Sequence, residues 1–327
     1  MNAFRYFEAA TPENAIGLLA GEPYGTFLAG GTLLIDLMKQ RVELPDALID
    51  INRLPLAEIE EQGGALHIGA MVRNSDLADH PAVRSRYPML SQALLSGASP
   101  QLRNMATVGG NIMQRTRCPY FRDPELPCNK REPNTGCGAI AGYHRMHAIL
   151  GTSDKCIAVH PSDMCVALVA LDAIVHMEST AGKRSVPLLE FHLLPGDTPE
   201  EETVLQRGEL ITAVEIPDLP FARRSTYLKV RDRASYEFAL TSAAVAIEVK
   251  DGKIRAARVA LGGVGTKPWR AYEAERVLVD SAPRGSVYRQ AAEAALAGAR
   301  PGSQNKFKLE LAKETIVRAL EQVEELP

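Results

Sequence analysis

The segment from Cys118 to Cys156 constrains this chain most strongly, because it places four of the five cysteines within 39 residues. Cys118, Cys128, Cys137 and Cys156 are separated by 9, 8 and 18 residues. Zinc sites usually contain cysteines paired roughly two to four residues apart, and this segment has no such pair. Wide, irregular spacing instead suits a cluster that gathers thiolates from several directions within a loop. The spacing therefore favours an iron–sulfur cluster with these four cysteines as ligands.

The composition of the segment also favours a metal centre. Its prolines and glycines prevent long helices or strands, and a loop of this length needs something to hold it together. They are Pro119, Pro124, Pro127, Pro133, Gly136, Gly138 and Gly142. A [4Fe–4S] cluster with four thiolates carries a net charge of about −2, which flanking cations would offset. The candidates are Arg115, Arg117, Lys130, Arg131 and Arg145.

Other interpretations of the cysteines stay open at this point. The segment could bind zinc, or it could be a mobile loop whose cysteines are free or disulfide-bonded. His144 or His147 could replace one cysteine as a ligand, although a solvated or core histidine is the simpler interpretation. Cys165 lies within an apolar helical pattern at 164–171, so we expect it to be a small buried hydrophobic residue.

Two glycine turns indicate an anion site. Ala29-Gly30-Gly31-Thr32 follows a predicted strand at 26–28 and precedes a predicted helix at 33–39, and Ala106–Asn111 contains a second such turn. Glycines let the backbone approach a phosphate, and a helix N-terminus favours negative charge. A plain turn is the alternative for each. The run 262–268 lacks the third glycine of a dinucleotide fingerprint, and the chain contains no G-x-x-x-x-G-K-[ST] motif.

The remaining pattern predicts an α+β protein. Residues 1–55 read as a compact β-α-β-α-β unit, with strands at 4–7, 26–28 and 47–51. Strands at 56–60 and 65–68, helices at 75–78 and 90–95, and a hairpin at 173–186 follow, and 193–208 reads as a surface loop. From residue 221 we expect strands at 226–230, 241–249 and 254–261, then helices at 270–278, 287–297 and 306–324.

Composition excludes several classes of partner. A net charge of −3 and 6% aromatic residues argue against nucleic-acid binding. No apolar run reaches the roughly 18 residues of a membrane span, so no membrane insertion is expected. The N-terminus shows neither the basic nor the apolar region of a signal peptide.

Five segments together resemble the FAD-binding subunits of the molybdenum hydroxylase (xanthine dehydrogenase) superfamily. They are LAGGTLLIDLMK, IGAMVRNSDLA, QLRNMATVGGNI, HPSDMCVALVALDA and KVRDRASYEFAL. The resemblance implies a two-part FAD-binding domain of the vanillyl-alcohol-oxidase type at 1–220, with a small part at 1–55 and a larger part at 56–220. It also implies a C-terminal α+β domain at 221–327, like that of CO dehydrogenase flavoproteins. Most members lack the insertion at 115–158. In this chain it most resembles the insertion of the FAD subunit of bacterial periplasmic aldehyde oxidoreductase, which carries a [4Fe–4S] cluster there.

The resemblance also implies a set of FAD-binding residues. The first loop and the second turn would clamp the pyrophosphate, Asp163 would touch the adenosine half, and Lys229 would lie near the isoalloxazine ring. By themselves, Asp163 reads as a helix cap and Lys229 as an exposed strand lysine. The full set is Thr26, Phe27, Leu28, Ala29, Gly30, Gly31, Thr32, Leu33, Leu34, Thr107, Gly110, Asn111, Asp163 and Lys229. No residue of this chain is expected to act as a catalytic acid or base.

The implied function is electron transfer within a heterotrimer. A large subunit with molybdenum cofactor would oxidise an aldehyde, a small subunit would carry two [2Fe–2S] clusters, and the FAD of this chain would pass electrons to an external acceptor. The alternatives are the flavin subunit of a 4-hydroxybenzoyl-CoA reductase and a non-redox nucleotide-binding assembly module. The resemblance favours the periplasm, reached by export with a signal-bearing partner, and the cytoplasm is the alternative.

Overall fold

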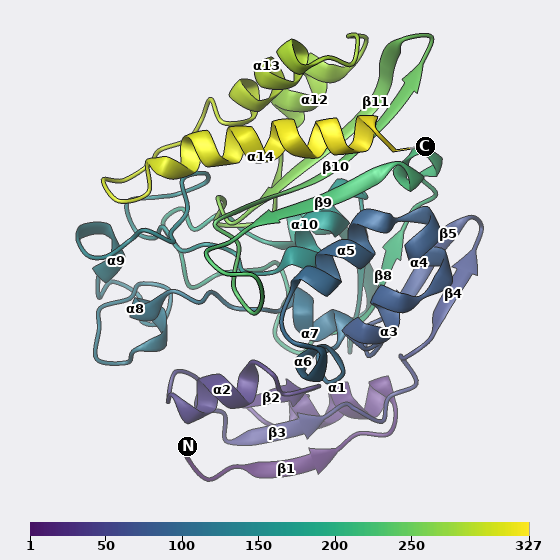
Figure 1. Cartoon of the computed structure of the whole chain (residues 1–327). Helices are drawn as coiled ribbons and strands as arrows, with labels where there is room; N and C mark the ends of the chain where they lie inside the picture. Colours follow the sequence, from purple (N-terminus) through teal and green to yellow (C-terminus); the bar gives the residue numbers. More distant parts are fainter. Residues whose placement is uncertain (327) are drawn as a thin grey trace.

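A computed structural model describes residues 1–326 of the chain and arranges them around three sheets (Figure 1). The first sheet is parallel, with the order β1-β3-β2, and lies at the bottom of Figure 1. Its strands are Arg5–Glu8, Gly25–Leu28 and Ala47–Asp50 for β1, β2 and β3, and its helices are Pro12–Ala20 for α1 and Leu34–Lys39 for α2. Thr11 caps α1 by accepting a hydrogen bond from the N–H of Asn14, with Pro12 at the first helical position. The predicted β-α-β-α-β unit is confirmed.

The second sheet is antiparallel, with the order β4-β5-β8-β6-β7. Its strands in chain order are Ile59–Gln62 for β4, Ala65–Gly69 for β5, Ile174–Ser179 for β6, Gly182–Pro187 for β7 and Leu210–Ile216 for β8. The strand predicted at 56–60 begins only at Ile59. Leu56 lies outside it, because its carbonyl accepts the N–H of Met71 and its own N–H donates to the carbonyl of Leu54. The segment 193–208 is a loop, as predicted, and an isolated β-bridge joins its Thr203 to His192.

Helices cover one face of this sheet and share its core. They are Asn74–Asp79 for α3, Pro81–Arg86 for α4, Pro88–Ser96 for α5, Pro100–Arg103 for α6, Val108–Ile112 for α7, Asp163–Ala170 for α10 and Leu188–Phe191 for α11. Every residue from Met164 to Ala170 is buried, which is why α10 is apolar on all sides. The predicted role of Cys165 as a buried hydrophobic residue of this helix is confirmed.

The third sheet, with the order β12-β11-β10-β9, lies at the top of Figure 1 under three helices. Its elements are Pro220–Arg223 for the 3₁₀ turn η1, Ser225–Val230 for β9, Thr241–Lys250 for β10, Lys253–Gly262 for β11, Trp269–Arg270 for β12, Tyr272–Leu278 for α12, Gly285–Ala295 for α13 and Phe307–Glu324 for α14. Asp251 and Gly252 both have positive φ and make the predicted tight hairpin turn. Arg270 belongs to β12 rather than to the predicted helix, because its backbone pairs with Ala260.

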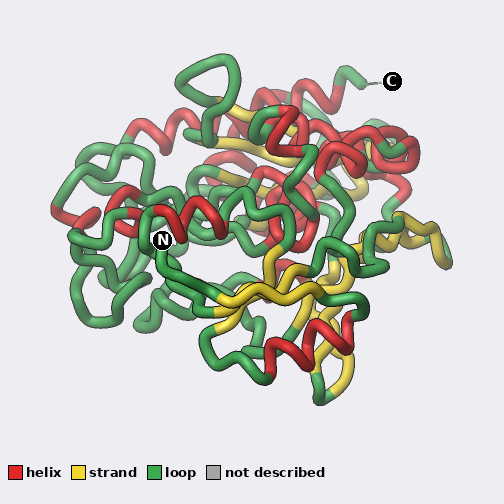
Figure 2. The backbone as a smooth tube through the Cα atoms, turned by 90° about the horizontal axis from the view of Figure 1, so that it is seen from below, coloured by secondary structure: helices red, strands yellow, loops and turns green. Residues whose placement is uncertain are grey.

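The cysteine segment has little regular structure, as its prolines and glycines predict. Its helices are single turns, Pro119–Arg122 for α8 and Gly138–Ala141 for α9. Both lie on the left in Figure 1, and the same side of the molecule is mostly loop in Figure 2. Across residues 1–326, no helix has the length and apolarity needed to cross a bilayer. Mixed helices and sheets throughout confirm the α+β class.

Candidate functional site

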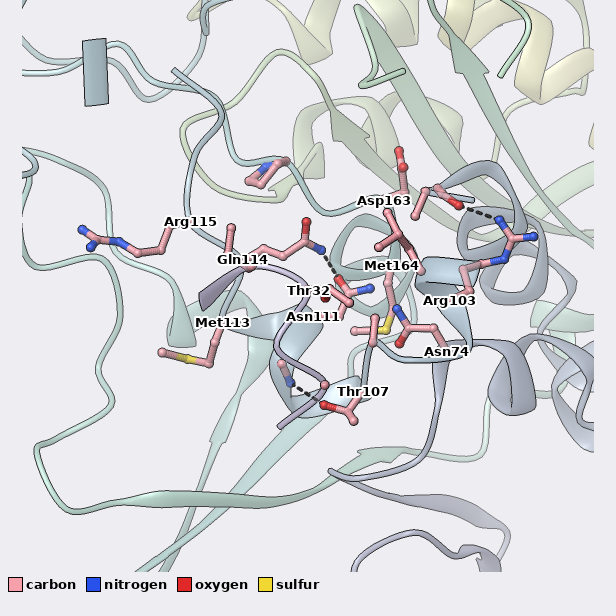
Figure 3. Close-up of a pocket in the computed structure, with 18 of the residues that line it drawn as sticks. Thr32, Asn74, Arg103, Thr107, Asn111, Met113, Gln114, Arg115, Asp163 and Met164 are labelled. Atoms are coloured by element: carbon pink, nitrogen blue, oxygen red, sulfur yellow. Dashed lines mark hydrogen bonds between the residues drawn. The ribbon is translucent and has the colours of Figure 1, made fainter. Parts of the chain in front are cut away.

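A cleft of about 530 Å³ lies where the first sheet unit, the helices of the second sheet and β9 meet. All predicted FAD-binding residues except Leu28 line it. Leu28 is the last residue of β2, and its carbonyl accepts the N–H of Ile51. In Figure 3, Thr32 of the first glycine turn lies beside Asn111 of α7, and Thr107 lies at the start of the same helix. The cleft size falls in the range of about 300–1,000 Å³ usual for small-molecule sites.

The two glycine turns approach each other closely. A Cβ on Gly30 would lie 1.9 Å from the carbonyl oxygen of Met105, so only glycine fits at this position. Gly31 has a φ of +69°, which glycine adopts without strain. The side-chain amide of Asn52 donates to the carbonyl of Ala29 at 2.9 Å and fixes the turn from outside. This backbone cradle suits a bulky anionic group such as a pyrophosphate.

The second turn is the start of a short helix rather than a plain turn. The Oγ1 of Thr107 accepts the N–H of Gly110 at 3.2 Å and caps α7. The Oδ1 of Asn111 accepts hydrogen bonds from Gln114 at 2.5 Å and from the hydroxyl of Ser162 at 2.6 Å. Asn111 is therefore held in place by protein groups while it lines the cleft.

Asp163 and Lys229 meet as a buried ion pair beside the cleft. Their carboxylate and ammonium lie 2.7 Å apart, and only 10% and 3% of the two side chains are exposed. The interpretation of Lys229 as an exposed strand lysine is therefore wrong. The cap of α10 is Ser162, whose Oγ accepts the N–H of Cys165 at 3.1 Å, so Asp163 is the first residue of the helix and not its cap.

Sequence reasoning missed Tyr227 and Asn74. The hydroxyl of Tyr227 donates to Asp163 at 2.5 Å, and burial, followed by the charge of Asp163, raises the pKa of Tyr227 well above its ordinary value. Tyr227 lies two residues before Lys229 on β9, so strand alternation could have suggested that both side chains reach the same face. Asn74 is buried, lines the cleft and has no hydrogen-bond partner for its Oδ1, which leaves an acceptor for a ligand hydroxyl.

The four predicted cluster ligands line one small cavity. Cys118, Cys128, Cys137 and Cys156 surround it together with Tyr120 and Phe121, and Cys128 pairs with Cys137 through a backbone bridge. All five cysteines are free, so the disulfide interpretation is wrong. Burial raises the pKa of Cys118 to about 12 and that of Cys156 to about 11, so binding of a metal would release protons.

Among residues 1–326, no three of these four thiols lie as close together as the ligands of a single zinc ion. Thiolates around one tetrahedral zinc lie about 3.8 Å apart, given Zn–S bonds of about 2.3 Å. Two groups of three candidate ligand atoms gather within 4.8 Å in residues 1–326, and neither contains any of these four cysteines. In a cubane each thiolate binds a different iron, so the sulfurs stand farther apart.

Of the five flanking cations, Lys130 lines the cysteine cavity as expected, whereas the four arginines bond to carboxylates or backbone carbonyls. Arg117 and Arg122 both pair with Asp36 of α2, Arg115 pairs with Glu43 and Glu202, and Arg145 pairs with Asp232. Lys130 pairs with Glu202 at 3.3 Å, while Arg131 donates to the carbonyls of Tyr120 and Phe121. These ion pairs tie the cysteine segment to the body of the protein, including the helix that follows the first glycine turn.

The histidines of the segment have different surroundings. His144 cannot easily act as a ligand, because its Nδ1 contacts the carbonyl of Gly142 at 2.9 Å and its Nε2 accepts the N–H of Gln304 at 3.2 Å. His147 lies against a cysteine, with its Nε2 3.2 Å from the Sγ of Cys118. Burial lowers the pKa of His147 to about 4.

A second cavity of about 210 Å³ lies between the two sites. It shares Arg117, Pro161 and Asp163 with the large cleft and Cys118 with the cysteine cavity. The cysteine cavity and the cleft are therefore neighbours, separated by Cys118 and the side chains around His147.

Comparison with known proteins decides the family. Residues 2–219 match the model of the FAD binding domain in molybdopterin dehydrogenase, and residues 226–323 match the CO dehydrogenase flavoprotein C-terminal domain. The chain is 51% identical to the aldehyde oxidoreductase FAD-binding subunit PaoB of Escherichia coli over 98% of both chains.

The chain belongs to the family of FAD-binding subunits of the molybdenum hydroxylases.

Other members of this family are also similar to this chain over nearly its whole length. The glyceraldehyde dehydrogenase medium chain of Sulfolobus acidocaldarius is 30% identical over 98% of both chains. Among solved structures, carbon monoxide dehydrogenase from Hydrogenophaga pseudoflava superposes with a TM-score of 0.77 and 28% identity, covering 98% of this chain and 97% of that one. The resemblance inferred from the sequence motifs is confirmed. FAD is the cofactor of the matched domain, and the glycine cradle together with the open Oδ1 of Asn74 fits such a ligand.

Proposed function

We propose that this chain is the FAD- and [4Fe–4S]-carrying electron-transfer subunit of a heterotrimeric, molybdenum-dependent aldehyde oxidoreductase. The observation that carries the proposal is the presence of two neighbouring sites in one chain: a cleft fit for FAD and a cavity lined by four free cysteines. The partners would be a molybdenum-cofactor large subunit and a [2Fe–2S] small subunit, with an external electron acceptor.

FAD, when bound, supplies redox chemistry that couples single-electron donors to a two-electron acceptor. The residues of this chain hold and orient it. The backbone of Gly30 and Gly31 would cradle the pyrophosphate, and Asn74 and Asn111 would supply polar contacts. Asp163 stays fixed by Lys229 and Tyr227 at the wall of the cleft, so that its position is set before the cofactor binds.

The four cysteines would hold the [4Fe–4S] cluster, which organises a segment that has almost no regular structure of its own. We place this cluster off the main electron path and assign it mainly to stabilising the segment or a subunit contact. In a Cys128→Ser variant of the assembled complex we expect aldehyde-driven reduction of the flavin to persist. Retained assembly with complete loss of flavin reduction would contradict this role.

The substrate class rests on the relatives. PaoB is named as a subunit of an aldehyde oxidoreductase, and the Sulfolobus relative is named as a chain of a glyceraldehyde dehydrogenase. We therefore favour an aldehyde over the 4-hydroxybenzoyl-CoA alternative, and an electron-transfer role over a non-redox assembly module. We also propose the periplasm, through export of the folded complex on a partner's signal, with the cytoplasm as the alternative.

Anaerobic addition of an aromatic or aliphatic aldehyde to the purified complex tests this function. We expect the flavin absorption near 450 nm to bleach within the enzyme's turnover time. 4-Hydroxybenzoyl-CoA, which accepts electrons in the alternative reductase, should fail to reoxidise a flavin that has been reduced chemically. A complex whose flavin is not reduced by any aldehyde would contradict the proposal. Fractionation of cells that produce the complex, followed by detection of the chain, tests the compartment.

A further inference from the structure

His147 is fixed against a cysteine by contacts from two directions. Its Nε2 lies 3.2 Å from the Sγ of Cys118, and only 4% of the residue is exposed. Its backbone N–H donates to the carbonyl of His144 at 3.1 Å, and its carbonyl accepts the side-chain amide of Asn305 at 3.2 Å. Asn305 lies just before α14, so the C-terminal part of the chain holds this histidine in place.

The same loop is also held by a buried lysine. The Nζ of Lys308, on the first turn of α14, donates to the carbonyl of Met146 at 2.9 Å and to that of Gly263 at 2.6 Å. Lys308 is fully buried, and none of the ion pairs found among residues 1–326 includes it. Lys308 therefore fixes the backbone of Met146, the residue that precedes His147.

The hydrogen-bonding pattern defines which ring nitrogen of His147 carries a proton. The Nδ1 is buried and has no hydrogen-bond partner among the described residues. A buried N–H without an acceptor is costly, whereas an N–H on Nε2 would point at the sulfur of Cys118. A singly protonated ring thus places its hydrogen on Nε2, and a doubly protonated ring has one there as well.

We propose that His147 is a positioning residue that donates an N–H···S hydrogen bond to the Cys118 thiolate and raises the reduction potential of the [4Fe–4S] cluster. The inference rests on the proposed function, because it needs the cluster. Reduction adds negative charge to the cluster and its sulfurs, so a donor at one sulfur stabilises the reduced form more than the oxidised form. Neither the sequence spacing nor the family match assigns this role to a histidine.

A redox titration of the purified complex followed by electron paramagnetic resonance tests the proposal. In His147→Leu the equilibrium constant for reduction of the cluster should fall by about tenfold. For a one-electron couple this lowers the reduction potential by about 59 mV. His147→Gln keeps an N–H donor of similar reach and should restore most of the wild-type potential. His144→Leu is the matched control: it also removes a buried histidine that joins the cysteine segment to the C-terminal part, but His144 faces no cysteine, so the potential should not change.

A second measurement does not depend on how the variants fold. Wild-type complex labelled with ¹⁵N-histidine should show hyperfine coupling between the reduced cluster and a histidine nitrogen, and His147→Gln should abolish it. Absence of this coupling, or an unchanged potential in His147→Leu with the cluster present, would overturn the inference alone. Wild-type complex without any [4Fe–4S] signal would overturn both the proposed cluster and this inference.

Discussion

At the scale of single residues, the cleft depends on positions where no side chain fits. Gly30→Ala would place its Cβ 1.9 Å from the backbone oxygen of Met105, which cannot move aside as a flexible side chain would. We expect the two glycine turns to separate and FAD affinity to fall at least about tenfold, a loss of about 1.4 kcal/mol. The ratio of absorbance at 450 and 280 nm after gel filtration measures the retained flavin.

Gly17→Ala is the control for that substitution. Gly17 lies inside α1, and a Cβ there meets nothing within 4 Å. Alanine in a helix interior is favoured by about 1 kcal/mol over glycine, so this variant should keep its flavin and gain stability. Equal flavin loss in the two variants would show that the cradle does not bind the cofactor.

A second prediction at this scale concerns the ion pair of Asp163 and Lys229. Lys229→Met leaves a nearly buried carboxylate with Tyr227 as its one remaining side-chain donor, which should destabilise the protein by about 3 kcal/mol in urea unfolding. Lys250→Met removes a strand lysine that is 65% exposed and pairs with Glu248, and should cost less than about 1 kcal/mol. Similar effects of the two substitutions would contradict the buried role of Lys229.

Sequence alone could not show which partners these side chains choose. The motifs identified Asp163 and Lys229 as members of one site, but their direct contact joins residues 66 positions apart and depends on packing of α10 against the third sheet. The same limit applies to the arginines around the cysteines, whose charges pointed to the cluster but whose carboxylate partners lie in distant segments.

At the scale of elements, α14 anchors the cysteine segment through Lys308. Burial lowers the pKa of Lys308 to about 7, against an ordinary value of 10.5. Between these two values the unfolded chain binds more protons than the folded chain, so the free energy of unfolding should rise with pH across this window. We expect Lys308→Met to lose roughly 3 kcal/mol of that rise between about pH 7 and 10.

Urea unfolding at several pH values measures this effect, with Lys313→Met as the control on the same helix. Lys313 pairs with Glu310 near the surface, and its removal should leave the pH dependence nearly as in the wild type. Two results would contradict this role of Lys308. One is a wild-type protein whose free energy of unfolding does not increase as the pH is raised from 7. The other is the same increase in Lys308→Met.

Elements with strong local signals could be predicted, and those defined by long-range pairing could not. Thr11 and Pro12 predict the start of α1, and the apolar run 164–170 predicts α10. The short α7 was missed because Gly109 and Gly110 have low helix propensity, and it forms only under the cap of Thr107 and the contacts of Gly109 with Ala70. Arg270 was assigned to a helix because its pairing with β11 has no local sequence signal.

At the scale of the whole molecule, the flavin cleft and the cysteine cavity are neighbours. Ion pairs from Asp36 of α2 to Arg117 and Arg122 join the helix after the first glycine turn to the start of the cysteine segment. The cavity lined by Cys118, His147 and Asp163 lies between the two sites. The cysteine segment is therefore part of the architecture of the flavin cleft and not a separate appendage.

Cofactor composition tests this central claim most directly. FAD, iron and acid-labile sulfide should be quantified in the full-length chain purified without oxygen. We expect about one FAD, four iron and four sulfide per chain, with a flavin band near 450 nm above a broad iron–sulfur absorption. Cys128→Ser should lose iron and sulfide while keeping FAD. A wild-type chain with one FAD and no iron, or with zinc in place of iron, would contradict it.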